Sequence, residues 1–479
     1  MRLKELLRDV SCTAVYAPPE LEIRGVSYDS REVKPGELFA AIPGEKEDGA
    51  AFIARAFSAG AVCALCRNGT PTDVPRVETD APRRALAQIS ANWYARPAEA
   101  MCLIGVTGTN GKTTSTYLIR HILERVRQAK VGLVGTVQNV IGGNILPARR
   151  TTPESCDLQA LLHTMKEARC THAVMEVSSH ALALDRVWGL RFAAGLFTNL
   201  TRDHLDFHGT MEAYARAKAG LFTACDTAVY NRDDPWHEEI LARCGAPRIS
   251  FGLHRGAEVY AEAIELTPEG VSFTAVRGER AVPVKVSLPG RFSVYNVLGA
   301  MALALALGIP LEDSADALAD FAGVKGRMEV LDMPDRDFTV LIDYAHTPDA
   351  LENVLQTVRG FAAGRTVAVF GCGGDRDRSK RPQMGAIAAR WADYSVVTSD
   401  NPRSEAPEEI IREIVSGMSG AQYDVVPERQ SAIFYALDHA RTGDVIVLCG
   451  KGHETYQEIA GKKRHLDERE IVAEWLKSR

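Results

Sequence analysis

The residues best suited to chemistry lie at 105–114, where a glycine-rich turn leads into Lys112 and two threonines. An apolar run at 100–106 predicts a buried strand before the turn, and apolar residues at helical spacing over 115–126 predict a helix after it. Between such elements, backbone N–H groups and the helix dipole converge on one point and bind an anion. Lys112 can reach the outer phosphates of a nucleotide, and the Thr113 hydroxyl can ligate magnesium. We therefore predict a phosphate site formed by Gly108, Thr109, Asn110, Gly111, Lys112, Thr113 and Thr114.

Two further apolar runs end in polar residues that favour a metal ion. The run at 173–176 ends in Glu176, and the run at 196–197 leads into a polar loop that contains His204. Because ligands bind at the carboxyl ends of strands in parallel sheets, we expect both side chains beside the phosphate loop. The histidines and carboxylates of this region also fit zinc, but oxygen-rich surroundings favour magnesium, with His204 as a nitrogen ligand or water anchor. We expect His180 and His208 to be loop or core histidines.

Polar segments follow apolar runs near the C-terminus in the same way, at 343–348, 371–377, 400–405 and 450–454. Four loops at one edge of a sheet would form a second site. Arg403 in the third segment offers a planar guanidinium that can bind a carboxylate through two hydrogen bonds. A proline turn before a helix at Pro407 is the alternative interpretation of that segment.

Alternating strands and helices must position these groups, and a length of 479 residues predicts about three domains. Closely spaced turns and strands predict a small N-terminal α/β domain over 1–98. The pattern over 99–325 predicts a central doubly wound parallel sheet of the P-loop type. A glycine-rich, charged linker near 323–329 leads into a Rossmann-like domain over 326–479. The predicted fold class is therefore α/β in three domains.

Composition limits the classes of partner and compartment. A net charge of −6 argues against a nucleic-acid partner, and the local basic run at 376–381 suits a small anion. Residues 1–10 have a charged, helical pattern rather than that of a signal peptide, and the most apolar run, 297–309, predicts a buried helix too short to cross a bilayer. We therefore expect a cytoplasmic protein without membrane insertion. Cys63 and Cys66 form a CxxC pair in a predicted strand, where they face opposite sides, so buried thiols are favoured over a zinc or redox site.

Several segments resemble the Mur ligases and their relative folylpolyglutamate synthetase. They are Gly-Thr-Asn-Gly-Lys-Thr-Thr at 108–114, Glu-Val-Ser-Ser-His at 176–180, Asn-Leu-Thr-Arg-Asp-His-Leu-Asp at 199–206 and Ala-Lys-Ala-Gly-Leu-Phe at 217–222. Asp-Ser-Arg at 29–31 and Asp-Asn-Pro-Arg at 400–403 resemble the branch of the family that adds the third residue of the peptidoglycan stem peptide. The resemblance covers nearly the whole chain.

The resemblance implies roles for residues throughout the chain. It assigns catalysis to Lys112, Glu176, His204 and Lys218, metal binding to Thr113, Glu176, His204 and Lys218, nucleotide binding to Asn296, Arg327 and Asp343, and substrate binding to Ser30, Thr151, Thr152, Ser178 and Arg186. The family's lysine at the place of Lys218 is carbamylated, and an anion there can hold a second magnesium that an ammonium would repel. Ser30 is equally compatible with a plain turn. Leu184 stands where some relatives have a glutamine.

The implied reaction is an ATP- and Mg²⁺-dependent amide ligation in peptidoglycan precursor synthesis, catalysed by a monomer. It adds meso-diaminopimelate to the D-Glu of UDP-MurNAc-L-Ala-D-Glu through an acyl phosphate. Arg403 would bind the distal carboxylate of diaminopimelate, with Asp400, Gly450 and Glu454 at its distal amino group and Arg376, Asn401 and Pro402 in support. A lysine-adding ligase and a folylpolyglutamate synthetase-like ligase are alternatives. A nucleotide-binding regulatory or scaffold protein is a third, which the retention of all four catalytic residues disfavours.

Overall fold

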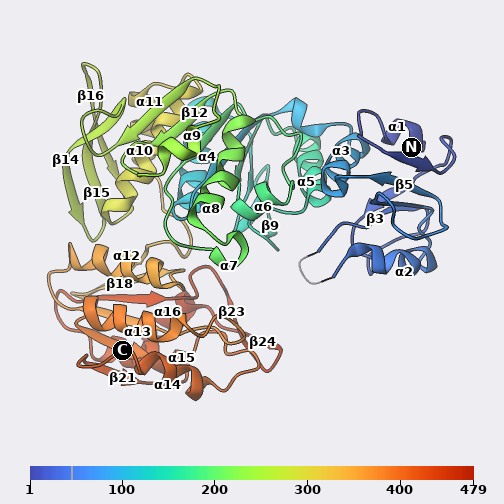
Figure 1. The fold of residues 1–479 in the computed structure, drawn as a ribbon. Helices are drawn as coiled ribbons and strands as arrows, with labels where there is room; N and C mark the ends of the chain where they lie inside the picture. The colour runs from blue at the N-terminus through green and yellow to red at the C-terminus, as the bar shows by residue number, and fades with distance from the viewer. Residues whose placement is uncertain (45–46) are drawn as a thin grey trace. The chain divides into compact units, whose positions relative to one another are not determined.

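The computed structural model describes residues 1–44 and 47–479. They divide into two compact units, Met1–Ser250 with Ala302–Ile309 (unit 1) and Phe251–Met301 with Pro310–Arg479 (unit 2) (Figure 1). The strands form sheets of five, eleven and six strands and a separate two-stranded hairpin, and helices flank the sheets. The predicted three-domain α/β class is confirmed.

The N-terminal sheet has the order β1-β5-β4-β3-β2. Its elements are α1 Leu3–Leu6, β1 Ala14–Tyr16, β2 Gly25–Ser27, β3 Glu37–Ala40, η1 Gly49–Phe52, α2 Ile53–Ser58, β4 Cys63–Arg67, β5 Arg76–Thr79 and α3 Pro82–Trp93. The helix predicted for residues 1–10 is limited to α1, because the chain turns after Leu6 and Asp9 has a φ of +60°. Cys63 and Cys66 pack into different hydrophobic clusters, as expected for opposite faces of a strand, and burial raises the pKa of Cys63 to about 12.

The centre of the eleven-stranded sheet places the phosphate loop. The parallel strands lie in the order β12-β11-β6-β10-β7, so β6 has β11 on one side and β10 on the other. Their bounds are β6 Cys102–Thr107, β7 Val131–Val134, β10 His172–Glu176, β11 Ala194–Phe197 and β12 Ala228–Asn231. The chain crosses to opposite sides of β6, and ligands bind at the carboxyl ends of strands beside such a switch point.

Both edges of this sheet contain antiparallel pairs, which the prediction of a doubly wound parallel sheet did not include. One edge has β8 Gln138–Ile141 and β9 Asn144–Pro147; on the other side, β13 Arg248–Gly252 is followed by β14 Val259–Thr267, β15 Gly270–Arg277 and β16 Arg280–Val286. Turns of two residues separate β14 from β15 and β15 from β16, and such short turns can only join antiparallel strands. Buried and exposed residues alternate along β16, as in a sheet with one solvent face.

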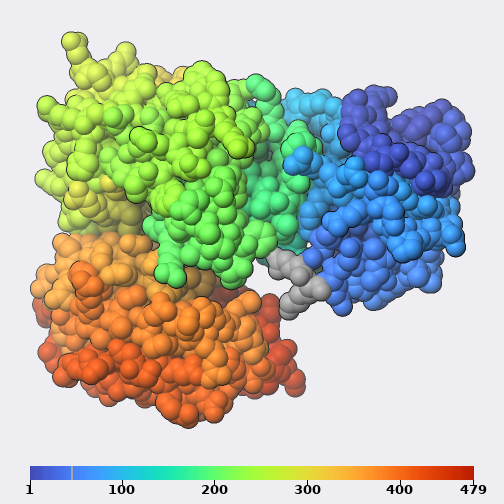
Figure 2. All heavy atoms as spheres, viewed as in Figure 1, coloured from blue at the N-terminus to red at the C-terminus, as the bar shows by residue number. Residues whose placement is uncertain are grey.

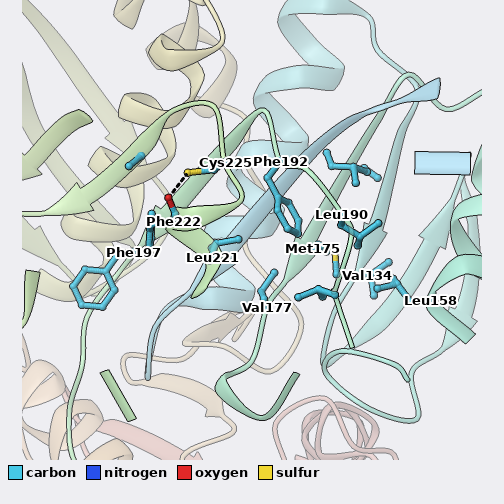
Figure 3. Packing of buried hydrophobic residues seen from close by; sticks show 14 of the residues in the cluster. Val134, Leu158, Met175, Val177, Leu190, Phe192, Phe197, Leu221, Phe222 and Cys225 are labelled. Atoms are coloured by element: carbon cyan, nitrogen blue, oxygen red, sulfur yellow. Dashed lines mark hydrogen bonds between the residues drawn. The ribbon is translucent and has the colours of Figure 1, made fainter. Parts of the chain in front are cut away.

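Helices bury the strands of the central sheet. Residues of α5 Ser155–Glu167, α8 Met211–Ala219 and α9 His237–Leu241 share one hydrophobic cluster with residues of β6, β10 and β11. Figure 3 shows this core around Phe192 and Met175, with the Cys225 thiol 3.8 Å from the carbonyl of Phe222. α4 Lys112–Arg127 packs on β6, β7 and β10. The other helices are η2 Pro97–Ala100, α6 Ser179–Ala183, α7 Leu205–His208, η3 Gly220–Thr223, α10 Arg291–Ala306 and α11 Leu311–Leu318.

The six-stranded sheet of unit 2 has the order β17-β18-β22-β19-β20-β21, parallel except for β17. The strands are β17 Glu329–Leu331, β18 Thr339–Asp343, β19 Thr366–Phe370, β20 Tyr394–Val397, β21 Tyr423–Val425 and β22 Val445–Cys449, and β23 Tyr456–Ile459 pairs with β24 Lys462–His465. The helices α12 Pro348–Arg359, α13 Lys380–Trp391 and α14 Pro407–Val415 contribute to one hydrophobic cluster, and α15 Arg429–Asp438 and α16 Glu468–Ser478 contribute to another. Helices therefore cover both faces of the sheet, and Figure 2 shows part of the surface of this unit in orange and red.

None of the helices within residues 1–44 and 47–479 combines the length and the apolar character needed to cross a membrane.

Candidate active site

The glycine-rich turn lies between β6 and α4, as predicted. Its backbone conformation and close contacts require glycine at two positions. Gly108 has a φ of +154°, and a Cβ there would lie 1.8 Å from the hydroxyl oxygen of Thr198. Gly111 has a φ of +82° and precedes the first turn of α4. The turn therefore brings the backbone N–H groups of a helix start to the carboxyl edge of the sheet, which suits an anion.

The segment after β11 holds this turn in place. The backbone N–H of Thr109 donates to the carbonyl of Asn199 at 2.9 Å, and the N–H of Asn110 donates to the side-chain oxygen of Asn199 at 2.9 Å. The hydroxyl of Thr198 donates to the carbonyl of Asn110 at 2.6 Å. The sequence predicts a loop here, but its pattern indicates no role for Thr198 or Asn199.

Two lysine side chains meet at the carbonyl of Gly108. Lys112 Nζ donates to the carbonyls of Gly108 and Thr109, both at 2.8 Å, and Lys218 Nζ donates to the carbonyl of Gly108 at 2.8 Å. Lys218 is 1% exposed and lies 4.6 Å above the ring of Tyr214. Burial first, and then the nearby charge of Lys112, lowers the pKa of Lys218 well below its ordinary value. Its neutral amine is therefore populated at a lower pH than that of an exposed lysine.

Glu176 ends β10 at the same edge of the sheet and is 1% exposed. Its Oε1 accepts hydrogen bonds from the Thr113 hydroxyl at 3.0 Å and from the Thr136 N–H at 2.8 Å, and its Oε2 accepts from the Thr136 hydroxyl at 3.0 Å. A Cβ at Gly135 would lie 2.6 Å from Oε1, so the carboxylate needs a glycine beside it. The sequence motifs link Thr113 with Glu176 but give no role to Thr136, which lies in the loop after β7.

His204 belongs to a group of aromatic rings near Lys218. It has a φ of +53°, its Nε2 lies 3.3 Å from the carboxylate of Asp203, and its ring lies 6.1 Å from that of Tyr214. The ring of His180 lies 4.8 Å from that of His204, and His208 Nε2 lies 2.9 Å from the hydroxyl of Ser179. Within the described residues, no three His, Cys, Asp or Glu side chains are arranged to hold a metal ion. A metal here would thus need ligands besides the ordinary side chains of Glu176 and His204.

The residues predicted to contact the muramoyl peptide form one hydrogen-bonded group. The Thr151 hydroxyl lies 3.0 Å from that of Thr136, and the Thr152 hydroxyl donates to the carbonyl of Glu176 at 2.8 Å. The N–H of Ser178 donates to Thr152 at 3.0 Å, and Arg186 Nη1 donates to the carbonyl of Thr152 at 3.2 Å. This group therefore adjoins the carboxylate of Glu176.

Glu154 lies among three arginines and was not predicted as a site residue. It is 3% exposed, and its carboxylate lies 3.1 Å from Arg83, 3.6 Å from Arg150 and 3.2 Å from Arg186. Arg83 comes from α3 and also donates to the carbonyl of Pro43 at 2.8 Å. One carboxylate facing three guanidinium groups leaves an excess of positive charge beside Thr152 and Ser178.

Ser30 lies in a turn that follows β2 and is 9% exposed. Asp29 shapes this turn by accepting hydrogen bonds from the N–H of Arg31 at 2.9 Å and from its guanidinium at 2.6 Å. Nearby, the Tyr28 hydroxyl donates to Asp157 at 2.5 Å. The geometry fits both a plain turn and a polar contact from Ser30.

The other predicted nucleotide residues belong to unit 2. Asn296 lies on α10 and is 6% exposed. Asp343 ends β18, and its Oδ2 accepts a hydrogen bond from the N–H of Met328 at 2.8 Å. Burial raises the pKa of Asp343, while the charge of Arg327 opposes that shift. The Arg327 guanidinium lies 5.0 Å above the ring of Tyr344. The structure thus brings Arg327 and Asp343 together.

Two of the predicted C-terminal loops pack tightly against each other. The N–H of Gly374 donates to the carbonyl of Asn401 at 2.9 Å, and a Cβ at Gly374 would lie 1.9 Å from the carbonyl oxygen of Pro402. A Cβ at Gly373 would lie 3.0 Å from Arg403 Nη1 and 3.9 Å from the Cγ of Arg376. The loop at 371–377 therefore brings Arg376 beside Arg403.

Arg403 is held in an uncommon backbone conformation. Its φ is +51°, its N–H donates to the carbonyl of Glu458 at 3.0 Å, and its carbonyl accepts from the N–H of Ala460 at 2.7 Å. Nη1 donates to the carbonyl of Gly374 at 2.7 Å, and Nε lies 3.4 Å from the carboxylate of Glu458. A positive φ at a residue other than glycine is uncommon and persists where surrounding contacts impose it. Sequence analysis did not identify Glu458 or the hairpin that fixes Arg403.

Lys451, which was not predicted as a site residue, lies among the remaining residues predicted to bind the amine. Lys451 Nζ donates to Asn401 Oδ1 and to Glu454 Oε2, both at 2.8 Å, and lies 3.5 Å from Asp400 Oδ1. Asn401 Nδ2 donates to Glu454 at 2.9 Å. Gly450 has a φ of +114°, and a Cβ there would lie 3.1 Å from Asp400 Oδ2. The structure therefore gathers Asp400, Asn401, Gly450 and Glu454 around Lys451.

Three family models match successive parts of the chain, and curated relatives match it over its full length. The models match as Mur ligase family, catalytic domain, at 22–94; Mur ligase middle domain at 106–304; and Mur ligase, glutamate ligase domain, at 326–452. The UDP-N-acetylmuramoyl-L-alanyl-D-glutamate--2,6-diaminopimelate ligase 1 of Clostridium acetobutylicum is 45% identical and covers 100% of this chain and 99% of its own length. The corresponding ligase of Caldanaerobacter subterraneus subsp. tengcongensis is also 45% identical, with 99% of each chain covered.

A solved structure of a UDP-N-acetylmuramoyl-L-alanyl-D-glutamate--2,6-diaminopimelate ligase has a TM-score of 0.71 to this chain. It is 32% identical and covers 100% of this chain and 99% of its own. The matched ranges include the phosphate loop, Glu176 and Arg403. The chain therefore belongs to the Mur ligase family and is an ATP-dependent ligase.

Proposed function

We propose that this ligase joins meso-diaminopimelate to the D-Glu carboxylate of UDP-MurNAc-L-Ala-D-Glu through an acyl phosphate, in the cytoplasmic synthesis of peptidoglycan precursors. One arrangement carries the proposal. Arg403 lies on the same loop as Asp400, and Asn401 between them is bonded to Glu454 at 2.9 Å. A guanidinium for a carboxylate and two carboxylates for an ammonium are the recognition groups of an amino-acid centre.

The residues around the phosphate loop fit a magnesium nucleotide. Gly108–Thr114 would bind the phosphates through backbone N–H groups. Lys112, which donates to the carbonyls of Gly108 and Thr109, would contact the outer phosphate oxygens. Asn296, Arg327 and Asp343 would bind the rest of the nucleotide. Thr113, Glu176 and His204 would hold Mg²⁺, which prefers oxygen ligands. Bound ATP and Mg²⁺ supply the phosphoryl group and the positive charge that activate the acid.

Lys218 would complete the metal site as a carbamate. Its neutral amine attacks carbon dioxide to form a C–N bond and releases one proton, which turns the neutral side chain into an oxygen-bearing anion. The lowered pKa of Lys218 supports this step, because the neutral amine is the nucleophile. The product could ligate magnesium beside Gly108, where an ammonium would repel it.

The muramoyl peptide would bind along Thr151, Thr152, Ser178 and Arg186, with Ser30 at its UDP end. The positive excess around Glu154 supports this placement, because the D-Glu residue brings carboxylates to it. The network from Thr152 to Glu176 would then orient the reacting carboxylate toward the phosphate loop.

Arg403 would select the amine by its distal carboxylate, with Arg376 and Pro402 supporting the loop. Lysine lacks that carboxylate, so it would leave the guanidinium without its anionic partner and should be a poor acceptor. A folylpolyglutamate synthetase-like activity would instead require a folate acceptor and glutamate. Purified protein should be assayed for ADP release with UDP-MurNAc-L-Ala-D-Glu and diaminopimelate, lysine or glutamate in separate reactions. Preference for lysine, or release that ignores the muramoyl substrate, would contradict the proposal.

A further inference from the structure

Lys451 is completely buried, although lysine is among the residues most often exposed. Its side chain is 0% exposed, and its ammonium lies 5.2 Å above the ring of Tyr456. An ammonium has three donors, and two of them make 2.8 Å bonds to Asn401 and Glu454. Burying such a charge is costly unless it is paired, so its carboxylate partners must hold it there.

Two partners of Lys451, Asp400 and Glu454, are assigned to the acceptor's amino group in the proposed reaction, and the third, Asn401, supports the same loop. We call Asp400, Asn401, Lys451 and Glu454 the ammonium cluster. Asn401 uses both ends of its amide within this region: Oδ1 accepts from Lys451 and from the N–H of Glu458 at 2.9 Å, and Nδ2 donates to Glu454. Asn401 therefore orients neighbours and has little capacity left for a ligand.

Asp400 has one buried carboxylate oxygen, Oδ1, that accepts no hydrogen bond from the described residues. The residue is 6% exposed, and among the described residues no donor makes a hydrogen bond to its Oδ1. The nearest cation to this atom is Lys451 Nζ, at 3.5 Å. A buried carboxylate oxygen without a donor is unfavourable, and an incoming ammonium would supply both the charge and the donors.

The charges of the cluster match one ammonium. Two carboxylates and one lysine leave a single net negative charge. Without Lys451, the two carboxylates would lose the cation that contacts both of them. The lysine thus offsets one of the two negative charges and leaves one for the substrate.

We propose that Lys451 is a positioning residue for the amine acceptor, holding Asp400, Asn401 and Glu454 in the arrangement that receives the acceptor's ammonium. The proposal rests on the proposed function and adds to it a residue that sets acceptor affinity without touching the reacting atoms. A purely structural lysine would affect all three substrates alike. A positioning lysine would affect the amine alone.

The test measures KM for ATP, for UDP-MurNAc-L-Ala-D-Glu and for diaminopimelate in wild type, Lys451→Met and a matched control. Lys463→Met is the control, because Lys463 is exposed and lies 4.0 Å above the same Tyr456 ring. We expect the diaminopimelate KM of Lys451→Met to rise about 10- to 100-fold, the effect of losing a charged hydrogen bond. The other two KM values should stay within about twofold of wild type. An unchanged diaminopimelate KM, or an equal change in all three, would overturn the proposal.

A double variant guards against misfolding of Lys451→Met. Lys451→Met/Glu454→Gln removes one charge of each sign and preserves the single net negative charge. Its diaminopimelate KM should exceed that of Glu454→Gln alone, and equality of the two would overturn the proposal. If wild type releases ADP with another amine and not with diaminopimelate, the proposed function fails. The same KM comparison with that other amine then still decides the role of Lys451.

Discussion

Lys218 on α8 and Gly108 in the phosphate loop are joined by a 2.8 Å hydrogen bond from the lysine nitrogen to the glycine carbonyl. The bond links a helix more than a hundred residues away to the turn that starts α4. Lys112 donates to the same carbonyl, so two lysine nitrogens converge on one oxygen. That proximity contributes to the lowered pKa of Lys218 and sets the first prediction.

Activity should depend on dissolved carbon dioxide. Buffers stripped of carbon dioxide should lower turnover at least about 10-fold, and added bicarbonate should restore it, because the proposed carbamate supplies a magnesium ligand. The folded-state pKa of Lys218 is depressed, so the neutral amine is lost only as pH falls through that lowered value. Reactivation by bicarbonate should therefore persist below the pH at which an exposed lysine reacts.

Lys218→Ala should abolish this bicarbonate response together with nearly all turnover. Arg216→Ala, an exposed change on the same helix, is the matched control. Full activity of Lys218→Ala in carbon dioxide-free buffer would refute the carbamate.

Arg403→Ala should reduce kcat/KM for diaminopimelate about 100-fold while changing that for lysine little. The guanidinium would pair with a carboxylate that only diaminopimelate carries, and losing one partner of such a pair costs about 2–5 kcal/mol. Arg464→Ala, on the exposed strand β24 of the neighbouring hairpin, is the control. A diaminopimelate-to-lysine ratio equal to that of wild type would show that Arg403 does not select the amine.

Glu154→Gln should destabilise the protein by about 3–5 kcal/mol, because it leaves Arg83, Arg150 and Arg186 without the carboxylate that faces them. Thermal unfolding measured at two salt concentrations checks this, and high salt should recover part of the loss. Glu238→Gln, on an exposed face of α9, should unfold like wild type. Equal melting temperatures for all three proteins would mean that the arginines need no partner at Glu154.

Acid should lower the folding stability of unit 2 by protonating Glu405. Hydrogen bonds from the buried Arg381 lower the pKa of Glu405 from 4.5 to about 2. Because the folded-state pKa lies below the unfolded one, this stabilisation is present above about pH 4.5 and is lost as pH falls toward about 2. It amounts to about 3 kcal/mol at most.

Glu405→Gln should be less stable than wild type at pH 7 and should lose less stability between pH 5 and pH 3. Denaturant unfolding across that range measures the difference. Parallel pH profiles for the two proteins would contradict the assignment.

Local pattern was sufficient to predict the phosphate loop and the strand-end residues. A strand, a glycine turn and a helix in succession leave few places for Lys112, and a carboxylate ending a buried strand must reach the sheet edge, as Glu176 does. The alternation along β14–β16 also indicates antiparallel strands, but the expectation of a parallel sheet obscured it.

Thr136, Glu154 and Lys451 were missed for a different reason. Their importance comes from burial or from distant partners, which lie 40 residues away for Thr136, 71 for Glu154 and 50 for Lys451. A lysine beside a predicted glycine gives no local sign that it is buried. The functional roles of all these residues remain predictions.

The order of Asn401 and Pro402 has a chemical consequence over the lifetime of the protein. Asparagine ages to aspartate chiefly when the nitrogen of the next residue attacks its side chain and closes a five-membered ring. Proline has no N–H to support that attack. Ageing at Asn401 would replace the donor to Glu454 with a third negative charge next to Asp400. By following Asn401, Pro402 protects from spontaneous decay an amide that bonds to Lys451, Glu454 and Glu458.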